Sequence, residues 1–384
     1  MTAAIDPVAL AQDLIRRPSV TPADAGAMDV LQTALERVGF ACRRLRFGEI
    51  ENLYARWGEQ RPNLCFAGHT DVVPVGDTNA WTHGAFDAAI VDGVLIGRGA
   101  VDMKGAIACM VAACERAIAA GRAKGSLSFL ITGDEEGVAV DGTGPVVETL
   151  LSEGENVDHC VLGEPASAGA LGDQLKVGRR GSLNATFTVE GRQGHVAYPQ
   201  QSINPIPVLV RLLDRLERQV LDEGYPEFPA SNLEITTFDV GNPATNVIPA
   251  RATARINIRF NPAHTGASLI DWLTKEAAIA QQGFAGHVTV ATSLTGDAFL
   301  TEPGPFVEVL AGAVGDVTGR KPILSTTGGI SDARFIRALC PVVEIGLLNT
   351  TMHAVDERVP VADLQALTDI YERVIIRYFD AWPL

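Results

Sequence analysis

The spacing of hydrophobic positions changes along this chain of 384 residues and predicts two kinds of architecture. In the first 180 residues, segments with apolar residues at helical spacing alternate with short apolar runs that are typical of buried strands. Helices are expected at 7–17, 23–38 and 103–120, and strands at 63–67, 126–132 and 158–162. Because strands that alternate with helices usually form parallel sheets, we expect an α/β domain with a mostly parallel sheet covered on both faces.

From residue 181 the chain alternates apolar and polar residues in four strands, which are separated by two amphipathic helices. The strands are expected at 182–190, 232–240, 251–260 and 287–293, and the helices at 203–221 and 268–282. This β-α-β-β-α-β order is that of a ferredoxin-like α+β unit with one exposed sheet face. The α/β pattern then returns, with a strand at 342–347 and a helix at 363–378. We therefore expect a discontinuous catalytic domain, 1–180 and 295–384, and an inserted domain, 181–294.

Composition and charge narrow the class of protein. The chain is 47% hydrophobic and long enough for two domains. Its formal net charge of −15 repels nucleic acid and anionic membrane surfaces, so neither is an expected partner. No apolar run reaches the ~18 residues of a membrane span, and the N-terminal segment is unlike an export signal. The six cysteines form no C-x-x-C pair, so we expect reduced thiols in a cytoplasmic protein.

Five separated motifs, GHTD, GAVDMKG, GDEEG, LGEP and TTMHAVDE, each contain a metal-type ligand. The ligands are His69, Asp102, Glu136, Glu164 and His353. Three of them follow predicted strands, and the carboxyl ends of parallel strands are where ligands gather in such sheets. Imidazole and carboxylate suit zinc, and five ligands serve two ions only if one carboxylate bridges them. Asp102, next to Gly99 and Gly105 at the head of a predicted helix, is the expected bridge.

Neighbouring residues predict the roles of acid, base and orienting group. Asp71 stands two residues after His69 on an extended segment, so it is expected to accept the other imidazole N–H. Adjacent glutamates cannot point the same way on an extended chain, so we interpret Glu136 as the ligand and Glu135 as the general base. Glu135 would take a proton from a metal-activated water that attacks a carbonyl, and then protonate the departing amine.

Oxyanion stabilisation requires a donor besides the metal, and His195 in the inserted domain is the candidate. It would have to be brought in by domain closure or by another subunit. Each motif has a structural alternative, because DEEG alone is a common acidic turn and GEP a common loop. Their joint occurrence at strand ends favours a metal site.

In order and approximate spacing, GHTDVVP, GRGAVDMKG, TGDEEG, LGEP and HAVDE resemble the di-zinc aminoacylase and carboxypeptidase family of metallopeptidases over essentially the whole chain. The resemblance implies two zinc ions per subunit, with cobalt able to substitute. One ion would be held by His69, Asp102 and Glu164, and the other by Glu136, Asp102 and His353, with Glu135 as the acid/base.

The same resemblance implies a homodimer through the inserted domain, which would also act as a lid. His195 and Asn246 would be contributed to the partner's active site. It further implies a cis peptide bond between Asp102 and Met103.

Longer segments, LGDQLKVGRRGS, GHVAYP, NPI, ATNVIP and TTGGISDARF, narrow the resemblance within the family. They imply a small-molecule substrate, N-succinyl-LL-2,6-diaminopimelate, cleaved to succinate and LL-2,6-diaminopimelate on the way to lysine. Two motifs depart slightly from the family sequence. We would expect a lysine and an asparagine in HAVDE, and a threonine and a glycine in GISDARF. No ligand is altered, so the departures bear on substrate tuning.

A substrate with three carboxylates requires local cations on an acidic protein, and guanidinium groups are the best carboxylate clamps. Arg179 and Arg259 are the candidates, while Arg180 is as readily interpreted as a surface ion-pair residue. The hydroxyls and glycine turn of residues 326–331 could anchor a carboxylate through Thr327, Gly328 and Ser331, or could be a plain structural loop.

Two alternatives stay open. The first is a related amide hydrolase, such as an acetylornithine deacetylase, an aminoacylase or an aminopeptidase. The second is a non-catalytic protein that keeps the fold, which predicts lost ligands or a lost base. All five predicted ligands and Glu135 are present.

Overall fold

The computed structural model describes residues 4–383, which divide into two compact units. The first unit comprises the residues up to Val177, the segment Thr301–Ser325 and the residues from Ser331 onward. The second comprises Gly178–Leu300 and Thr326–Ile330. The chain therefore leaves the first unit twice, once to build most of the second unit and once for the short segment Thr326–Ile330.

The first unit is built on an eight-stranded mixed sheet with the strand order β1-β2-β6-β3-β7-β18-β8-β17. The strands are β1 (Ala41–Phe47), β2 (Ile50–Trp57), β3 (Asn63–His69), β6 (Ser126–Thr132), β7 (His159–Leu162), β8 (Gln174–Lys176), β17 (Ile323–Ser325) and β18 (Val342–Glu344). The four central strands β6, β3, β7 and β18 run parallel, which confirms the expected parallel core. Every residue of β3 and β6 is buried, so both faces of the sheet are covered at its centre.

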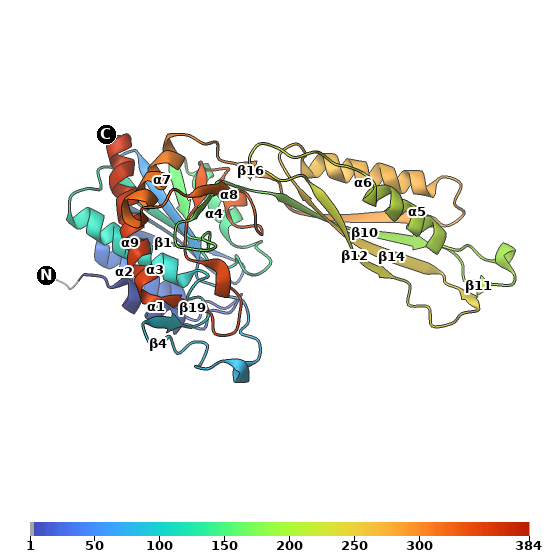
Figure 1. Ribbon diagram of the computed structural model, residues 1–384, viewed down its shortest axis with the longest axis horizontal. Helices are drawn as coiled ribbons and strands as arrows, with labels where there is room; N and C mark the ends of the chain where they lie inside the picture. Colours follow the sequence, from blue (N-terminus) through green and yellow to red (C-terminus); the bar gives the residue numbers. More distant parts are fainter. Residues whose placement is uncertain (1–3, 384) are drawn as a thin grey trace. The chain divides into compact units, whose positions relative to one another are not determined.

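Helices cover this sheet in groups that contact one another. They are α1 (Pro7–Ile15), α2 (Ala27–Val38), α3 (Lys104–Ala119), α4 (Thr143–Ser152), α7 (Pro305–Thr318), α8 (Ala333–Ile336) and α9 (Val361–Ala381). Figure 1 shows α9 beside α1 and α3, and it also packs on α7. Small and apolar side chains occupy nearly every position of α3, and this helix is buried nearly all round. The short helices α4 and α8 contact each other and the strands β6 and β18.

A smaller three-stranded sheet lies in the first unit, with the order β19-β5-β4. Its strands are β4 (Ala89–Val91), β5 (Val94–Ile96) and β19 (Arg358–Pro360), and all its pairings are antiparallel. Short 3₁₀ turns, η1 (Thr78–Ala80) and η3 (Asn349–Thr351), lie nearby in the sequence. This sheet joins a segment near residue 95 to one near residue 359.

The second unit has a four-stranded antiparallel sheet with the order β12-β14-β10-β15. Its main elements are β10 (Gly181–Glu190), α5 (Ile206–Glu217), β12 (Asn232–Asp239), β14 (Arg251–Phe260), α6 (Gly266–Gln281) and β15 (His287–Gly296). Figure 1 shows α5 and α6 on one side of this sheet, where alternate residues such as Phe187 and Ile256 form the buried core. Two further ladders join β11 (Gly194–His195) to β13 (Val247–Ile248) and β9 (Gly178–Arg179) to β16 (Phe299–Leu300), and η2 (Pro199–Gln201) follows β11.

Two further expectations concern the cysteines and the absence of membrane-spanning helices. All six cysteines are free, and five of them are buried. Among the described residues, no helix combines the length and the apolar character that crossing a membrane requires.

Candidate metal centre

The carboxylate of Asp102 lies between two imidazoles in the first unit. Its Oδ1 is 3.1 Å from Nε2 of His69, and its Oδ2 is 3.2 Å from Nε2 of His353. Each histidine also faces a glutamate: Nε2 of His353 lies 2.8 Å from Oε1 of Glu136, and Nε2 of His69 lies 3.7 Å from Oε1 of Glu164. The structure therefore brings together all five residues that the sequence predicts as ligands, with one oxygen of Asp102 directed to each histidine.

Their positions follow from the sheet. His69 is the last residue of β3, and Glu136 and Glu164 lie in the loops that follow its parallel neighbours β6 and β7. Parallel neighbours end at the same edge, so these three side chains converge there. Asp102 lies two residues before the start of α3, with a cis peptide bond to Met103 as the resemblance implies. His353 comes from the loop between η3 and β19.

The tautomer of His69 suits a metal ligand. Its Nδ1 lies 2.9 Å from the backbone carbonyl oxygen of Asp71, to which it donates. Because that bond holds a proton on Nδ1, the neutral form of His69 directs the lone pair of Nε2 at Asp102 and Glu164. The orienting group is thus the carbonyl of Asp71, whereas the sequence suggested its carboxylate, which lies farther away at 3.6 Å.

The carboxylate of Asp71 is used differently, because it holds the turn that carries two glutamates. Its Oδ1 accepts from the backbone N–H of Glu135 at 3.2 Å, and its Oδ2 from that of Glu136 at 3.0 Å. The buried carboxylate of Asp134 accepts two further N–H groups of the same loop, from Val140 and Asp141. Two carboxylates therefore fix the backbone from which Glu135 and Glu136 project.

Glu135 lies beside the cluster as well. Ligand atoms of His69, Glu135 and Glu164 all lie within 4.8 Å of one another, as do those of His69, Asp102 and Glu136. Burial, followed by repulsion from Asp332, Glu136 and Asp102, outweighs the attraction of His69 and raises the pKa of Glu135 to about 8. The geometry of the described residues suits Glu135 either as a base next to a metal or as a further ligand.

The charges of the site are unbalanced. Burial, with repulsion from Asp102 and Glu135, raises the pKa of Glu164 well above its ordinary value. Hydrogen bonds that His353 donates to Asp102 and Glu136 raise its pKa to about 10. Burial lowers the pKa of His69, but a hydrogen bond to Asp102 and the nearby carboxylates outweigh that effect, so this pKa is also raised. The cluster of buried carboxylates thus draws positive charge onto its imidazoles.

A divalent cation fits this set of donors. The Oε1 atom of Glu164 is buried without a hydrogen-bond partner among the described residues, although it points toward His69. An unpaired buried carboxylate oxygen is costly, and imidazole and carboxylate atoms are the ligands that zinc takes in proteins. Cations at this place would balance the carboxylates while both imidazoles stay neutral.

The remaining predicted residues fall mostly in the second unit. His195 and Asn246 are both exposed there, on adjoining segments: the pairing of β11 with β13 sets His195 opposite Val247, and the N–H of Val196 donates to the carbonyl of Asn246 at 3.1 Å. Arg259 is half-buried on β14, where its Nε donates to Oδ1 of Asn257 at 3.1 Å.

Arg179 and the loop with Thr327 and Gly328 contact each other within the second unit. The Nη1 of Arg179 donates to the backbone carbonyls of Thr327 and Gly329, at 3.3 and 3.0 Å, and only 8% of Arg179 is exposed. Through Nη1 this guanidinium holds the loop. Its expected part in binding a substrate carboxylate stays a prediction. Gly328 has a φ of +108°, which suits a glycine turn.

Ser331 belongs to the first unit, where its hydroxyl donates to Oε1 of the buried Glu344. The next residue, Asp332, is buried too and accepts from the hydroxyl of Thr143 at 2.6 Å. The Ser331 hydroxyl thus has a partner inside the protein. Its expected part in substrate binding stays a prediction.

Two charged residues at the site received no role from the sequence. Glu357, in the last ligand motif, and Arg98, before Asp102, form a buried ion pair of 2.7 Å beside the ligands. The sequence indicated this pair only weakly, because its one sign was that two ligand motifs carry residues of opposite charge.

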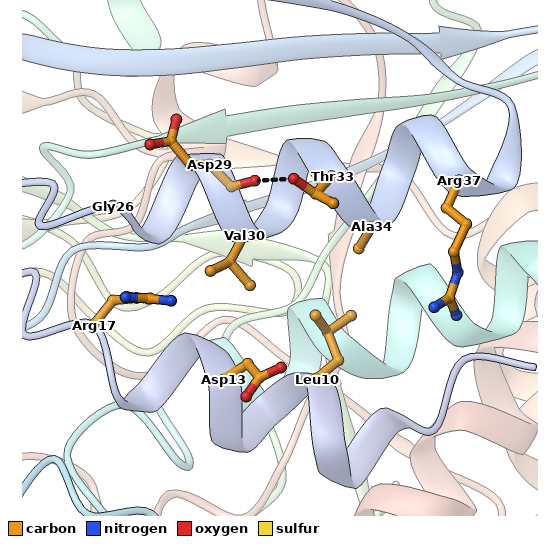
Figure 2. A pocket seen from close by; sticks show the side chains of 9 residues that line it. All are labelled: Leu10, Asp13, Arg17, Gly26, Asp29, Val30, Thr33, Ala34 and Arg37. Atoms are coloured by element: carbon orange, nitrogen blue, oxygen red, sulfur yellow. Dashed lines mark hydrogen bonds between the residues drawn. The ribbon is translucent and has the colours of Figure 1, made fainter.

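A groove elsewhere in the first unit is unrelated to this cluster. It lies between α1 and α2, and Figure 2 shows Arg17 and Arg37 at its two ends. Its lining consists of Leu10, Asp13, Arg17, Gly26, Asp29, Val30, Thr33, Ala34 and Arg37. This lining contains none of the residues predicted from the motifs.

Comparison with known proteins places the chain among metallopeptidases. It matches the model of Peptidase family M20/M25/M40 over residues 65–377. A succinyl-diaminopimelate desuccinylase of Phenylobacterium zucineum (strain HLK1) is 66% identical over 379 residues, covering 99% of this chain and 100% of that protein. A protein of the same name from Caulobacter vibrioides (strain NA1000 / CB15N) is 65% identical over 382 residues, covering 100% of this chain and 98% of its own length.

Solved structures share the fold at low sequence identity. Aminopeptidase PepT from Bacillus cereus ATCC 10987 has a TM-score of 0.80 at 19% identity, covering 97% of this chain and 99% of that one. The Bacillus subtilis YXEP protein, described as a dinuclear metal binding peptidase, has a TM-score of 0.72 at 15% identity, covering 98% of each chain. These likenesses bear on the fold alone.

Proposed function

The chain belongs to Peptidase family M20/M25/M40, and on this premise we propose that it hydrolyses N-succinyl-LL-2,6-diaminopimelate to succinate and LL-2,6-diaminopimelate. Full-length relatives at 65–66% identity that carry the name of this activity support the substrate. The observation that carries the chemistry is the Asp102 carboxylate, which directs one oxygen to His69 and the other to His353.

We propose that the cluster holds two zinc ions, with cobalt able to substitute. His69, Asp102 and Glu164 would hold one ion. Glu136, Asp102 and His353 would hold the other. Bound there, the ions would supply an activated water and a polarised scissile carbonyl. Glu135 takes the proton of the attacking water and returns it to the departing amine, a role that its position beside His69 and Glu164 supports.

The number of ions is tested with His353→Ala. This histidine contacts Asp102 and Glu136 at the exposed side of the cluster, so its loss weakens only the second site. Elemental analysis after dialysis should give about two zinc equivalents for the wild type and about one for the variant. Two retained equivalents in His353→Ala would contradict the proposed ligand set.

Substrate choice is tested by measuring kcat/KM for succinyl-diaminopimelate and N-acetylornithine side by side. We propose that Arg259 binds a carboxylate that acetylornithine lacks at that position. A hydrogen bond to a charged group contributes about 1.5–3 kcal/mol, so Arg259→Ala should lower kcat/KM for the succinyl substrate by roughly 10- to 100-fold. Activity on acetylornithine should change little.

The matched control is Arg255→Ala, which removes an exposed arginine from the same strand. It should leave both activities near those of the wild type. Faster turnover of acetylornithine by the wild type, or an equal loss on both substrates in Arg259→Ala, would favour the related deacetylase instead.

We further propose that the second unit is a dimerisation and lid domain. His195 and Asn246 would reach the active site of the partner, and their exposure on adjoining segments supports this. Light scattering coupled to size exclusion should give a mass near twice 40.7 kDa. If the protein is monomeric at micromolar concentration and fully active, this part of the proposal fails.

A cytoplasmic location is also proposed, and the six free cysteines support it because cytosolic thiols stay reduced. Cell fractionation with an antibody to the protein tests the location. Recovery in an exported fraction would contradict it.

A further inference from the structure

The side chain of Glu357 supports the backbone that carries Asp102. Its Oε1 accepts from the N–H groups of Val101 and Asp102, at 2.8 and 3.0 Å. Its Oε2 accepts from the N–H of Gly99 at 3.1 Å and from Nη1 of Arg98 at 2.7 Å. One carboxylate with no exposed surface thus receives four hydrogen bonds, which occupy its acceptor sites.

Arg98 links Glu357 to the backbone of His353. Its Nη2 donates to the backbone carbonyl of His353 at 3.3 Å, and its guanidinium lies over the ring of Trp81 at 5.4 Å. Only 2% of Arg98 is exposed. His353 has a φ of +61°, in the left-handed region that a non-glycine residue adopts only when its surroundings hold it there.

The backbone pairing reinforces this link. The N–H of Gly97 donates to the carbonyl of Glu357 at 2.8 Å, next to the ladder between β5 and β19. The segment before Asp102 and the segment after His353 are therefore joined by both a backbone ladder and a buried ion pair. A shift of one segment moves the other.

We propose that Glu357 and Arg98 are positioning residues that hold the backbones of Asp102 and His353 at a fixed separation and thereby set the geometry of the two metal sites. The inference rests on the proposed metal pair. Neither residue belongs to the proposed set of metal ligands. They act through the ligands, as hydrogen-bond partners behind metal ligands commonly do.

Loss of the Glu357 charge has a defined physical effect. Glu357→Gln keeps the volume of the side chain but replaces one acceptor oxygen by an NH₂ donor. At least one buried N–H group near Asp102 then lacks a partner, and Arg98 becomes a buried charge without a counter-ion. The loop can relieve both only by moving, and Asp102 moves with it.

The test uses the full-length chain, depleted of metal and titrated with Co²⁺. Glu357→Gln should lower the affinity for at least one Co²⁺ equivalent by about 10- to 100-fold. It should also shift the visible absorption bands of the Co²⁺-loaded protein, which report ligand geometry. In the zinc-loaded protein, kcat should fall while KM for succinyl-diaminopimelate stays near that of the wild type.

The matched control is Glu155→Gln, which breaks the ion pair of Glu155 with Arg56 in the same unit. Arg56 lies on β2 opposite Ser128, toward the start of β6 and therefore away from the edge where the ligands converge. This variant should lower the unfolding temperature at most, with Co²⁺ affinity and spectrum unchanged. A merely structural role for Glu357 predicts the same result for Glu357→Gln.

The inference is overturned if folded Glu357→Gln binds two Co²⁺ equivalents with wild-type affinity and wild-type absorption bands. If this variant does not fold, Arg98→Lys decides, because it keeps a positive charge beside Glu357 but loses the bond to the His353 carbonyl. If Arg98→Lys binds one Co²⁺ equivalent more weakly than the wild type, the inference is supported. If it binds two Co²⁺ equivalents with wild-type affinity, the inference is refuted. A wild-type chain that binds fewer than two Co²⁺ equivalents would instead count against the proposed function.

Discussion

At the scale of single residues, the site depends on where individual oxygen and nitrogen atoms point. Asp102 is almost fully buried and still ionises readily, because its hydrogen bonds with His353 and His69 lower its pKa against the effect of burial. The two glutamates of GDEEG differ in their neighbours: Glu136 faces His353, and Glu135 faces His69 and Glu164. Adjacent residues of the same type therefore have different surroundings, which is the basis for assigning them different roles.

Replacement of Glu135 tests this assignment. Glu135→Gln should retain two zinc equivalents and reduce kcat by about 10²- to 10⁴-fold, the usual contribution of a general acid–base group. Elemental analysis and steady-state kinetics on the same preparation give both values. The control Glu59→Gln alters an exposed glutamate in the turn after β2 and should behave as the wild type. Loss of a metal from Glu135→Gln would make Glu135 a ligand.

At the scale of elements, strand ends and helix starts place the ligands. The loop before α3 is particularly tight: Gly99 has a φ of +88°, and a Cβ on Gly105 would lie 2.3 Å from the carbonyl oxygen of Ala100. Both glycines flank Asp102, so the backbone can fold back on itself there only without side chains. The first turn of α3 and the loop that carries Asp102 form one packed element.

Gly105→Ala should therefore disturb the metal site as well as the helix. Insertion of a methyl group against a backbone carbonyl forces a shift that costs about 1–3 kcal/mol, despite the better helix propensity of alanine. We expect a lower midpoint of thermal unfolding and weaker zinc binding, measured by calorimetry and by metal titration.

The control for that substitution is Gly315→Ala in α7, where the new Cβ would be 3.6 Å from its nearest neighbour. This change should leave the midpoint unchanged or raise it, because alanine favours a helix interior by up to about 1 kcal/mol. If Gly105→Ala and Gly315→Ala have the same midpoint of thermal unfolding, the loop before α3 can accommodate a methyl group at little cost.

At the scale of the whole molecule, the cluster is assembled from segments nearly 300 residues apart. His69 and His353 meet at one aspartate because the chain returns to the first unit after building the second. The central strands β6, β3 and β7 supply three of the ligands from one edge of a buried sheet. Metal binding should therefore stabilise the fold of the first unit as a whole.

Removal of metal tests that coupling. A ligand that binds only the folded state stabilises it by about 2.7 kcal/mol at a concentration 100 times its Kd. Dialysis against a chelator should thus lower the unfolding temperature, and returning two zinc equivalents should restore it. If a chain shown to be free of metal unfolds at the original temperature, the ligands contribute nothing to the fold.

Much of the architecture was predictable from local pattern. The expected strands at 63–67, 126–132 and 158–162 correspond to β3, β6 and β7, and the four alternating strands after residue 181 to β10, β12, β14 and β15. Periodicity carries this information because burial repeats every two or 3.6 residues within an element. The hairpin of β1 and β2 and the helices α4 and α7 were not predicted.

The order of residues along the chain was enough to select the five candidate ligands, because each lies beside glycine or after an apolar run in a recognisable motif. Only the folded chain decided which atoms meet. The two oxygens of Asp102 contact two histidines, the carbonyl of Asp71 accepts from His69, and the hydroxyl of Ser331 donates to Glu344. It also revealed the ion pair of Arg98 and Glu357. Such contacts join residues far apart in the chain and depend on burial and direction, which no local spacing encodes.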